Sequence, residues 1–278
     1  MRAKNRKIIG KAVSVLLAAV LGGSLLLGLA GCGNADGKVV KVGASSTPHA
    51  EILANLKDDM AAQGYTLEII EYSDYVKPNL DTDAGDTDAN YFQHLPYLDG
   101  FNAANGTDLV SVAAVHFEPM GLFPGKTQAL ADLPDGATIA IDNDPTNEAR
   151  ALLLLADLGL ITLPANAGFE TTPKDIVSNP KNLKFVEVEA AAVPRQLAEV
   201  DMGVINGNYA LAAGLDPTTA VAREDPNSQA AQTYANILVV KAGMENDPGI
   251  MALVELLLSD KTRDFINENY PGVVIPVF

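Results

Sequence analysis

A strand–helix–strand pattern at residues 39–70 constrains the fold of this chain more than any other feature. Val39-Val40-Lys41-Val42-Gly43 is typical of a strand that ends in glycine, and residues 65–70 alternate apolar and polar side chains as a second strand. Between them, apolar residues recur at helical spacing at positions 52, 53, 56 and 60. The segment has the length of a βαβ unit, which predicts a parallel sheet with helices on its faces.

The same alternation of strands and helices recurs along the chain. We expect further strands at 109–115, 137–141, 183–188, 202–205 and 237–240, a helix at 145–158, and one final helix that carries Ile250, Leu253, Leu256, Leu257 and Phe265. Two α/β series, one before about residue 115 and one from 137 to 206, predict two lobes, with crossings near 118–123 and 235–240. Ligands in open α/β sheets bind beyond the carboxyl ends of strands, so the loops there are the first places to look for a site.

The N-terminal segment has the features of an export signal. Basic residues at positions 2, 4, 6, 7 and 11 precede an apolar run at 12–30, and the run ends in Leu29-Ala30-Gly31-Cys32, which holds the only cysteine. Small residues before a lone cysteine resemble a bacterial lipobox, which implies cleavage before Cys32 and a lipid such as palmitate on its sulfur. The alternative is a transmembrane helix, but the run is short and interrupted by glycines and serines.

The charge of the chain limits its partners. Five of its 19 basic residues and none of its 35 acidic residues precede Cys32, so the remainder carries 14 basic and 35 acidic residues, a formal charge of −21. Such acidity argues against nucleic acid, whose phosphates would be repelled, and against electrostatic docking on anionic lipid. The lipid chain would therefore be the anchor. With no other cysteine, the mature chain forms no internal disulfide and depends on core burial.

The strongest local motif is Asn143-Asp144-Pro145-Thr146-Asn147-Glu148-Ala149-Arg150, directly after a predicted strand. Asp144 suits the N-cap and Pro145 the first helical position. Asn147 and Arg150 are three apart and share one helix face. Unpaired N–H groups at a helix start, together with the planar guanidinium, would suit a carboxylate ligand. The same pattern also fits an ordinary capped helix whose arginine pairs with a surface acid.

A second motif, Asp86 to Tyr97, holds three aromatic residues and a histidine within seven positions after a strand-like stretch: Tyr91, Phe92, His94 and Tyr97. With Tyr75, such rings would wall an apolar pocket suited to a thioether, since sulfur–ring contacts are favourable by about 0.3–1.5 kcal/mol. They equally fit a plain hydrophobic core.

Asparagines form a third group of candidates. Asn206 and Asn208 follow one predicted strand and Asn236 precedes another. Their amides would bind both ends of an amino acid, although asparagine is also a common turn residue.

Enzyme motifs are missing from the sequence. It contains no Gly-x-Ser-x-Gly elbow, no glycine-rich phosphate loop and no His-Glu-x-x-His. His49, His94 and His116 lack the spacing of a metal site, although three histidines and a carboxylate would be able to hold zinc across a cleft. We therefore expect no catalysis, no cofactor and no metal.

Taken together, these segments resemble the NlpA/MetQ family of methionine-binding lipoproteins. The resemblance covers essentially the whole mature chain and rests on five stretches in order: 88–94 (DANYFQH), 118–122 (EPMGL), 143–147 (NDPTN) with 150–155 (RALLLL), 204–210 (VINGNYA) and 236–239 (NILV). It implies a two-lobed periplasmic-binding-protein fold of the second type, α/β, with a mixed sheet flanked by helices in each lobe. It also implies that methionine is caught between the lobes and delivered to an ABC permease and its ATPase.

The resemblance also implies roles for residues. The arginine matching Arg150 holds the ligand carboxylate, the asparagines matching Asn147, Asn206 and Asn236 bind its polar end, and the side chains matching Tyr75, Phe92, His94 and Tyr97 surround its side chain. Asn208 fits the pattern less well than Asn206. Asp142 departs from the family, where a neutral residue is common, and a carboxylate there would weaken binding unless it faces away from the ligand.

The resulting hypothesis divides the chain into a signal peptide at 1–31, a linker at 32–38, a first lobe at 39–117 and 239–278, and a second lobe at 118–238. The expected protein is a monomeric, lipid-anchored, non-catalytic L-methionine-binding protein on the extracytoplasmic face of the cell membrane. D-Methionine, a methionine-containing dipeptide or another amino acid remain alternatives for the ligand. A surface lipoprotein without a transport role is the alternative function.

Overall fold

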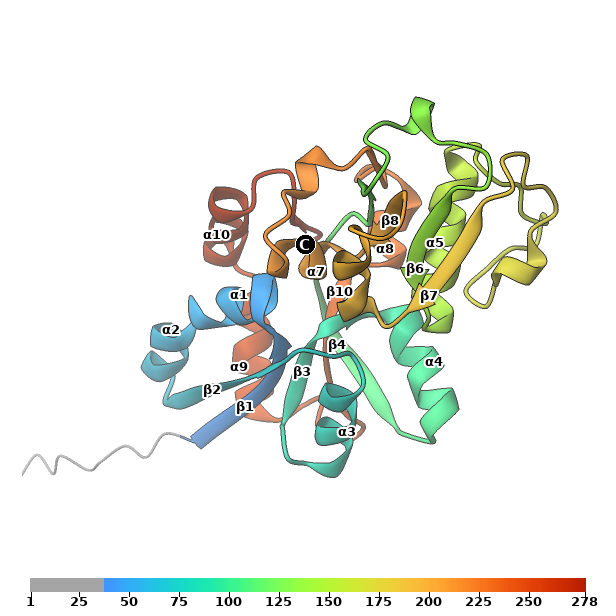
Figure 1. Ribbon diagram of the computed structural model, residues 1–278. Helices are drawn as coiled ribbons and strands as arrows, with labels where there is room; N and C mark the ends of the chain where they lie inside the picture. The colour runs from blue at the N-terminus through green and yellow to red at the C-terminus, as the bar shows by residue number, and fades with distance from the viewer. Residues whose placement is uncertain (1–37) are drawn as a thin grey trace, which may run out of the picture. The chain divides into compact units, whose positions relative to one another are not determined.

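The computed structural model describes residues 38–278 (Figure 1). Cys32, the expected signal peptide and the linker up to residue 37 lie outside the described residues. Within 38–278, no helix has the length and apolar character needed to cross a membrane.

Six strands form the first sheet, in the order β11-β4-β10-β3-β1-β2. Their bounds are β1 (Lys38–Ser45), β2 (Tyr65–Tyr72), β3 (Ala89–His94), β4 (Leu109–Phe117), β10 (Asn236–Lys241) and β11 (Ile275–Pro276). β1 is parallel to β2 and β3, whereas β10 runs antiparallel to β3 and β4, and β11 antiparallel to β4. The sheet is therefore mixed.

The predicted βαβ unit is confirmed at the start of this sheet. β1 pairs in register with β2 from Lys38↔Tyr65 to Ser45↔Tyr72. The connection contains α1 (Glu51–Ala54) and α2 (Lys57–Ala62), and the four apolar residues that predicted a helix, Ile52, Leu53, Leu56 and Met60, are all fully buried in the core beneath the sheet. Burial of about 1.5–3 kcal/mol for each such side chain explains why the amphipathic segment docks there.

Five strands form the second sheet, in the order β7-β6-β8-β5-β9. Their bounds are β5 (Gly121–Pro124), β6 (Thr138–Asp142), β7 (Lys184–Val188), β8 (Met202–Ile205) and β9 (Ala222–Arg223). β6 is parallel to β7 and β8, and β5 is antiparallel to β8 and β9. Helix α5 (Pro145–Asp157) lies against β6 (Figure 1), and its leucines share a core with Ile139 and Ile141.

The remaining helices flank the two sheets. They are α3 (Lys77–Ala84), α4 (Leu95–Asn105), α6 (Val193–Gln196), α7 (Gly207–Ala212), α8 (Gln229–Thr233), α9 (Pro248–Leu257) and α10 (Asp260–Asn269). The prediction of one final helix was wrong: α9 and α10 are separate, because the Ser259 side chain accepts from the Thr262 N–H and caps a new helix. Both helices pack on the first sheet.

The chain passes between the sheets twice. It leaves the first sheet after Phe117 and enters the second at Gly121, then leaves the second after Arg223 and returns to the first at Asn236. We call the elements around the first sheet the first lobe and those around the second sheet the second lobe. The predicted α/β fold, with a mixed sheet flanked by helices in each of two lobes, is confirmed.

Candidate ligand-binding site

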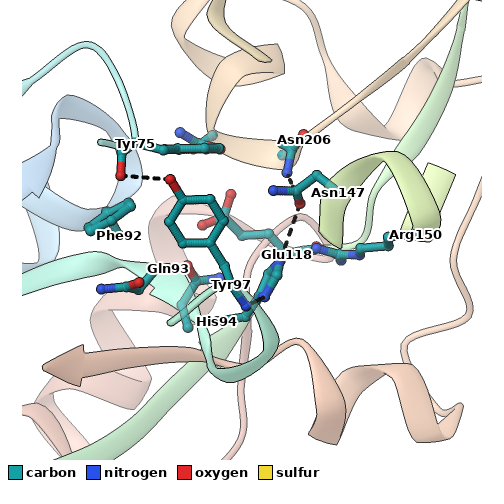
Figure 2. A pocket seen from close by; sticks show the side chains of 12 residues that line it. Tyr75, Phe92, Gln93, His94, Tyr97, Glu118, Asn147, Arg150 and Asn206 are labelled. Carbon is teal, nitrogen blue, oxygen red and sulfur yellow. Dashed lines mark hydrogen bonds between the residues drawn. The ribbon is translucent and has the colours of Figure 1, made fainter. Parts of the chain in front are cut away.

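A small cavity lies between the lobes, and the predicted side chains converge on it (Figure 2). All eight predicted ligand-binding residues line it: Tyr75, Phe92, His94, Tyr97, Asn147, Arg150, Asn206 and Asn236. Gln93, Glu118, Gly207 and Asn208 complete the lining.

The first lobe supplies an aromatic wall, which consists of Tyr75, Phe92 and Tyr97. Tyr75 lies between β2 and α3, Phe92 on β3 and Tyr97 on α4, and the three ring centroids are 5.6–6.0 Å apart. We expected the cluster to follow a strand, but residues 89–94 are themselves the fully buried strand β3. Phe92 and Tyr97 also pack with Phe101, so these rings are both core and cavity wall.

His94 joins the aromatic wall to the polar side chains. As the N-cap of α4, its Nδ1 accepts from the Tyr97 N–H at 3.2 Å, and its Nε2 lies 3.2 Å from Asn147 Oδ1. Burial, followed by the charge of Arg150, lowers the pKa of His94 to about 4. The ring is therefore neutral at physiological pH, with its proton on Nε2 and directed at Asn147.

The start of α5 is capped by the chain itself. Asp144 Oδ1 accepts from the N–H groups of Thr146 and Asn147, at 3.1 and 3.0 Å. The predicted cap is confirmed, but the expectation that these N–H groups are free for a ligand carboxylate was wrong, because Asp144 already occupies them. Asp144 also accepts from the Asn147 side-chain amide at 2.7 Å, and Asn206 donates to Asn147 Oδ1 at 2.9 Å. The amides at the polar end are thereby held in fixed orientations.

Arg150 is buried at the polar end of the cavity, with only 4% of its surface exposed. Its Nε and Nη2 donate to the two carboxylate oxygens of Glu224, at 2.8 and 2.6 Å, and Nη2 also donates to the Glu118 carbonyl at 3.0 Å. The guanidinium stacks on the Tyr234 ring at 4.2 Å. Burial favours a lower pKa for Arg150, but Glu224 outweighs it and raises the pKa. Glu224 thus fixes the guanidinium of Arg150 along the edge formed by Nε and Nη2. Nη1 takes no part in that pair.

Hydrogen bonds connect the lobes beside the cavity. The Tyr75 hydroxyl donates to Asn208 Oδ1 at 2.6 Å, and the Tyr209 hydroxyl donates to the Ser73 carbonyl at 3.2 Å. Together with the His94–Asn147 contact, these bonds hold the two lobes in a closed arrangement around the cavity.

Asp142 does not line the cavity, although it ends strand β6 nearby. It is 2% exposed, its Oδ1 accepts from the Asp144 N–H at 3.1 Å, and its Oδ2 has no partner among the described residues. Burial, and then the charge of Asp144, raise the pKa of Asp142 well above its usual value. Asp142 is thus a buried acid that is not part of the cavity lining.

The sequence prediction missed several residues that contact or line the cavity beside the predicted ones. Glu224, in the loop after β9, has no motif that would have singled it out, because it meets Arg150 only through tertiary structure. Glu118 belongs to the stretch 118–122 that carried the resemblance, and Asn208 was set below Asn206, yet both line the cavity.

The histidines do not group as the zinc alternative required. His94 lies in the cavity lining, whereas His49 and His116 meet Glu118, with ligand atoms within 4.8 Å of one another. His116 Nε2 is 2.7 Å and His49 Nε2 3.4 Å from Glu118 Oε1. His116 Nε2 therefore donates to the carboxylate, whereas the hydrogen bond of His49 Nε2 is to Asn236 Oδ1 at 3.0 Å.

Comparison with known proteins places this geometry in a family. Residues 40–278 match the family model described as NlpA lipoprotein. The methionine-binding lipoprotein MetQ of Bacillus subtilis is 41% identical over 269 residues, covering 92% of this chain and 97% of that protein. The membrane lipoprotein TpN32 of Treponema pallidum is 40% identical, covering 95% and 97%.

A solved structure shows the same fold. A nutrient-binding protein of Burkholderia cenocepacia, bound to methionine, superposes with a TM-score of 0.81 at 41% identity, over 86% of this chain and all of that one. With the family model spanning the whole described fold, this chain belongs to the NlpA lipoprotein family.

Proposed function

We propose that this protein is a non-catalytic substrate-binding protein that captures methionine between its lobes and delivers it to an ABC importer. The observation that carries the proposal is the cavity itself, where aromatic rings from the first lobe face Asn147, Arg150 and Asn206 of the second lobe. A thioether suits the rings, and an amino acid's charged end suits the polar side chains. The B. subtilis and B. cenocepacia relatives, named for or bound to methionine, support the same ligand.

We further propose that the eight predicted residues form two groups, each of which contacts a different part of the ligand. Tyr75, Phe92, His94 and Tyr97 surround the side chain of methionine, while Asn147, Arg150, Asn206 and Asn236 bind its polar end. Closure of the lobes removes water and strengthens the pairing of Arg150 with the ligand carboxylate, since charges attract more strongly at low dielectric.

The lobe boundaries in this proposal are 39–117 with 239–278, and 118–238. The chain leaves the first sheet at Phe117, in accord with the first boundary, while β10 begins at Asn236, three residues ahead of the second. The protein acts as a monomer, anchored through lipid on Cys32 at the extracytoplasmic face, and its partners are a permease and an ATPase.

Isothermal titration of the mature protein with L-methionine tests the proposal. Purified protein is first unfolded, dialysed and refolded, to remove any ligand it carries. We expect one molecule bound per chain, and no heat of binding above that of dilution would refute the function.

Mass spectrometry of the small molecule released on denaturation distinguishes methionine from a dipeptide or another amino acid. Chiral separation of that molecule distinguishes L- from D-methionine. Deletion of the gene is expected to reduce methionine uptake; unchanged uptake with impaired surface attachment would favour a non-transport lipoprotein instead.

A further inference from the structure

Glu118 is the one carboxylate in the lining of the cavity, and the proposed function gives it no role so far. It lies in the crossing between β4 and β5, at the polar end, and is 5% exposed. A buried carboxylate is costly unless it is hydrogen-bonded or paired with a cation. Its surroundings therefore indicate what it is held there to do.

Two histidines from separate elements lie beside the Glu118 carboxylate, and one of them is hydrogen-bonded to it. His116, on β4, has its Nε2 2.7 Å from Glu118 Oε1, and its Nδ1 is hydrogen-bonded to the Tyr91 hydroxyl. His49, in the segment Ser46–Ala50 after β1, has its Nε2 3.4 Å from the same oxygen and 3.0 Å from Asn236 Oδ1. Both nitrogens face oxygen acceptors, so both carry the proton.

These histidines are neutral donors rather than cations. Burial is the main cause that lowers the pKa of His49 to about 4 and that of His116 to about 3. The nearest permanent cation, Arg150, is already paired with Glu224 through two hydrogen bonds. Burial raises the pKa of the Glu118 carboxyl, against the opposing effects of His49 and Arg150. A further cation beside the carboxyl would therefore stabilise its ionised form.

Gly207 provides the space that the carboxylate occupies. A Cβ at this position would lie 2.8 Å from Glu118 Oε2 and 2.8 Å from the Glu118 Cβ. Any larger residue at position 207 would displace Glu118. The observed position of the Glu118 side chain therefore requires glycine at the start of α7. Glu118 Oε1 accepts from His116, and Glu118 Oε2 lies beside Gly207, a residue of the cavity lining.

We propose that Glu118 accepts the ammonium group of the ligand, and that it thereby makes the site select α-amino acids over analogues with a hydroxyl or oxo group at the same carbon. The inference rests on the proposed function and extends it to the chemistry of the selected substrate. An ammonium group supplies a positive charge beside Glu118, whereas a hydroxyl group donates a hydrogen bond without that charge and an oxo group supplies neither. Sites whose buried polar groups lose their partner discriminate strongly.

The test compares L-methionine with its 2-hydroxy analogue, 2-hydroxy-4-(methylthio)butanoate, by titration calorimetry on ligand-stripped mature protein. We expect the wild-type chain to prefer methionine by at least about 100-fold. Glu118→Gln should weaken methionine binding by about 100-fold and leave binding of the hydroxy analogue within several-fold of wild type, so the preference collapses. Glu68→Gln, on the exposed side of β2, is the matched control and should retain the full preference.

Gly207→Ala gives a second, independent test, which also serves if the Glu118→Gln chain does not fold. The glutamate is kept but displaced, so methionine binding should fall far more than binding of the hydroxy analogue. A wild-type preference retained by folded Glu118→Gln, or by Gly207→Ala, would overturn the inference while leaving methionine binding intact. A wild-type chain that binds no methionine would overturn the proposed function, and this inference with it.

Discussion

The two walls of the cavity are built in different ways. The aromatic wall comes from the first lobe and is held mainly by packing: Tyr75, Phe92 and Tyr97 contact one another and continue into the core through Phe101. The polar wall comes mostly from the second lobe and is held by charge-assisted hydrogen bonds, with Arg150 between Glu224 and the Glu118 carbonyl. A packed wall tolerates small changes in shape, whereas a hydrogen-bonded wall loses most of its effect when one partner is removed.

The largest expected effect is therefore on the polar wall. Arg150→Ala removes the guanidinium and leaves Glu224 buried without its cation. We expect methionine affinity to fall by about 30-fold to several thousand-fold, corresponding to about 2–5 kcal/mol. The free energy of unfolding should fall by about 3–5 kcal/mol, measured by urea denaturation.

The double variant Arg150→Ala with Glu224→Gln separates these two effects. Removal of the orphaned charge should restore much of the stability but none of the affinity. Undiminished methionine binding by either variant would show that the polar wall does not hold the carboxylate.

The next effect concerns Asp142, the buried acid at the end of β6. Because the pKa of Asp142 is raised, the folded chain keeps a proton that the unfolded chain releases above its usual carboxyl pKa of 3.8. Stability is therefore lost as pH rises through that window, by up to about 1.4 kcal/mol per pH unit. Asp142→Asn removes this loss, so the variant should equal wild type near pH 4 and be more stable than wild type at pH 7, by a margin that grows as the pH rises.

Thermal or urea unfolding at several pH values measures this difference. Asp132→Asn, an exposed position, is the control and should leave the pH profile unchanged. A gain in stability for Asp142→Asn that is the same at pH 4 and pH 7 would contradict the assignment.

A smaller effect tests the bond between the walls. Tyr75→Phe keeps the ring but removes the 2.6 Å hydrogen bond to Asn208. One such bond contributes about 0.5–1.5 kcal/mol, so methionine affinity should fall by about 2- to 12-fold with the aromatic wall otherwise intact. Tyr65→Phe, on β2 and outside the cavity lining, is the comparison variant; equal affinities for the two variants would deny the bond a role in closure.

The smallest effect concerns sulfur itself. Norleucine replaces the thioether sulfur with a methylene group, so it keeps the length of methionine and loses the sulfur–ring contact. We expect methionine to bind about 2- to 12-fold more tightly, since such contacts contribute about 0.3–1.5 kcal/mol. Phe92→Leu should reduce the ratio of methionine to norleucine affinity, as measured by competition calorimetry. An unchanged ratio would show that the sulfur does not contact the Phe92 ring.

The residues of the cavity differ in how far the sequence could predict them. Asp144 and Pro145 predict the start of a helix, and helical spacing places Asn147 and Arg150 on one face of it. Capping and helical spacing are local properties, so the sequence alone is enough to predict them. Glu224 is different, since it follows Arg150 by 74 residues and meets it only because β9 lies in the second sheet. No local pattern encodes such a pairing.

The same distinction holds for the fold. Strands with strong alternation or apolar runs were found, whereas β3 was missed because its Asn90, Gln93 and His94 look exposed in sequence. In the structure they are buried, and Asn90 and Gln93 hydrogen-bond to Asn79 of α3. Hydrophobic periodicity cannot predict polar side chains that are buried because they hydrogen-bond to one another.

The central claim is that the polar wall binds the charged end of methionine and the aromatic wall binds its side chain. A crystal structure of the ligand-stripped protein soaked with L-methionine tests this claim most directly. We predict electron density for one methionine in the cavity, with its carboxylate against the Arg150 guanidinium and its sulfur against Tyr75, Phe92 and Tyr97. Density with the amino acid reversed, or Arg150 turned away to solvent while methionine is bound, would contradict it.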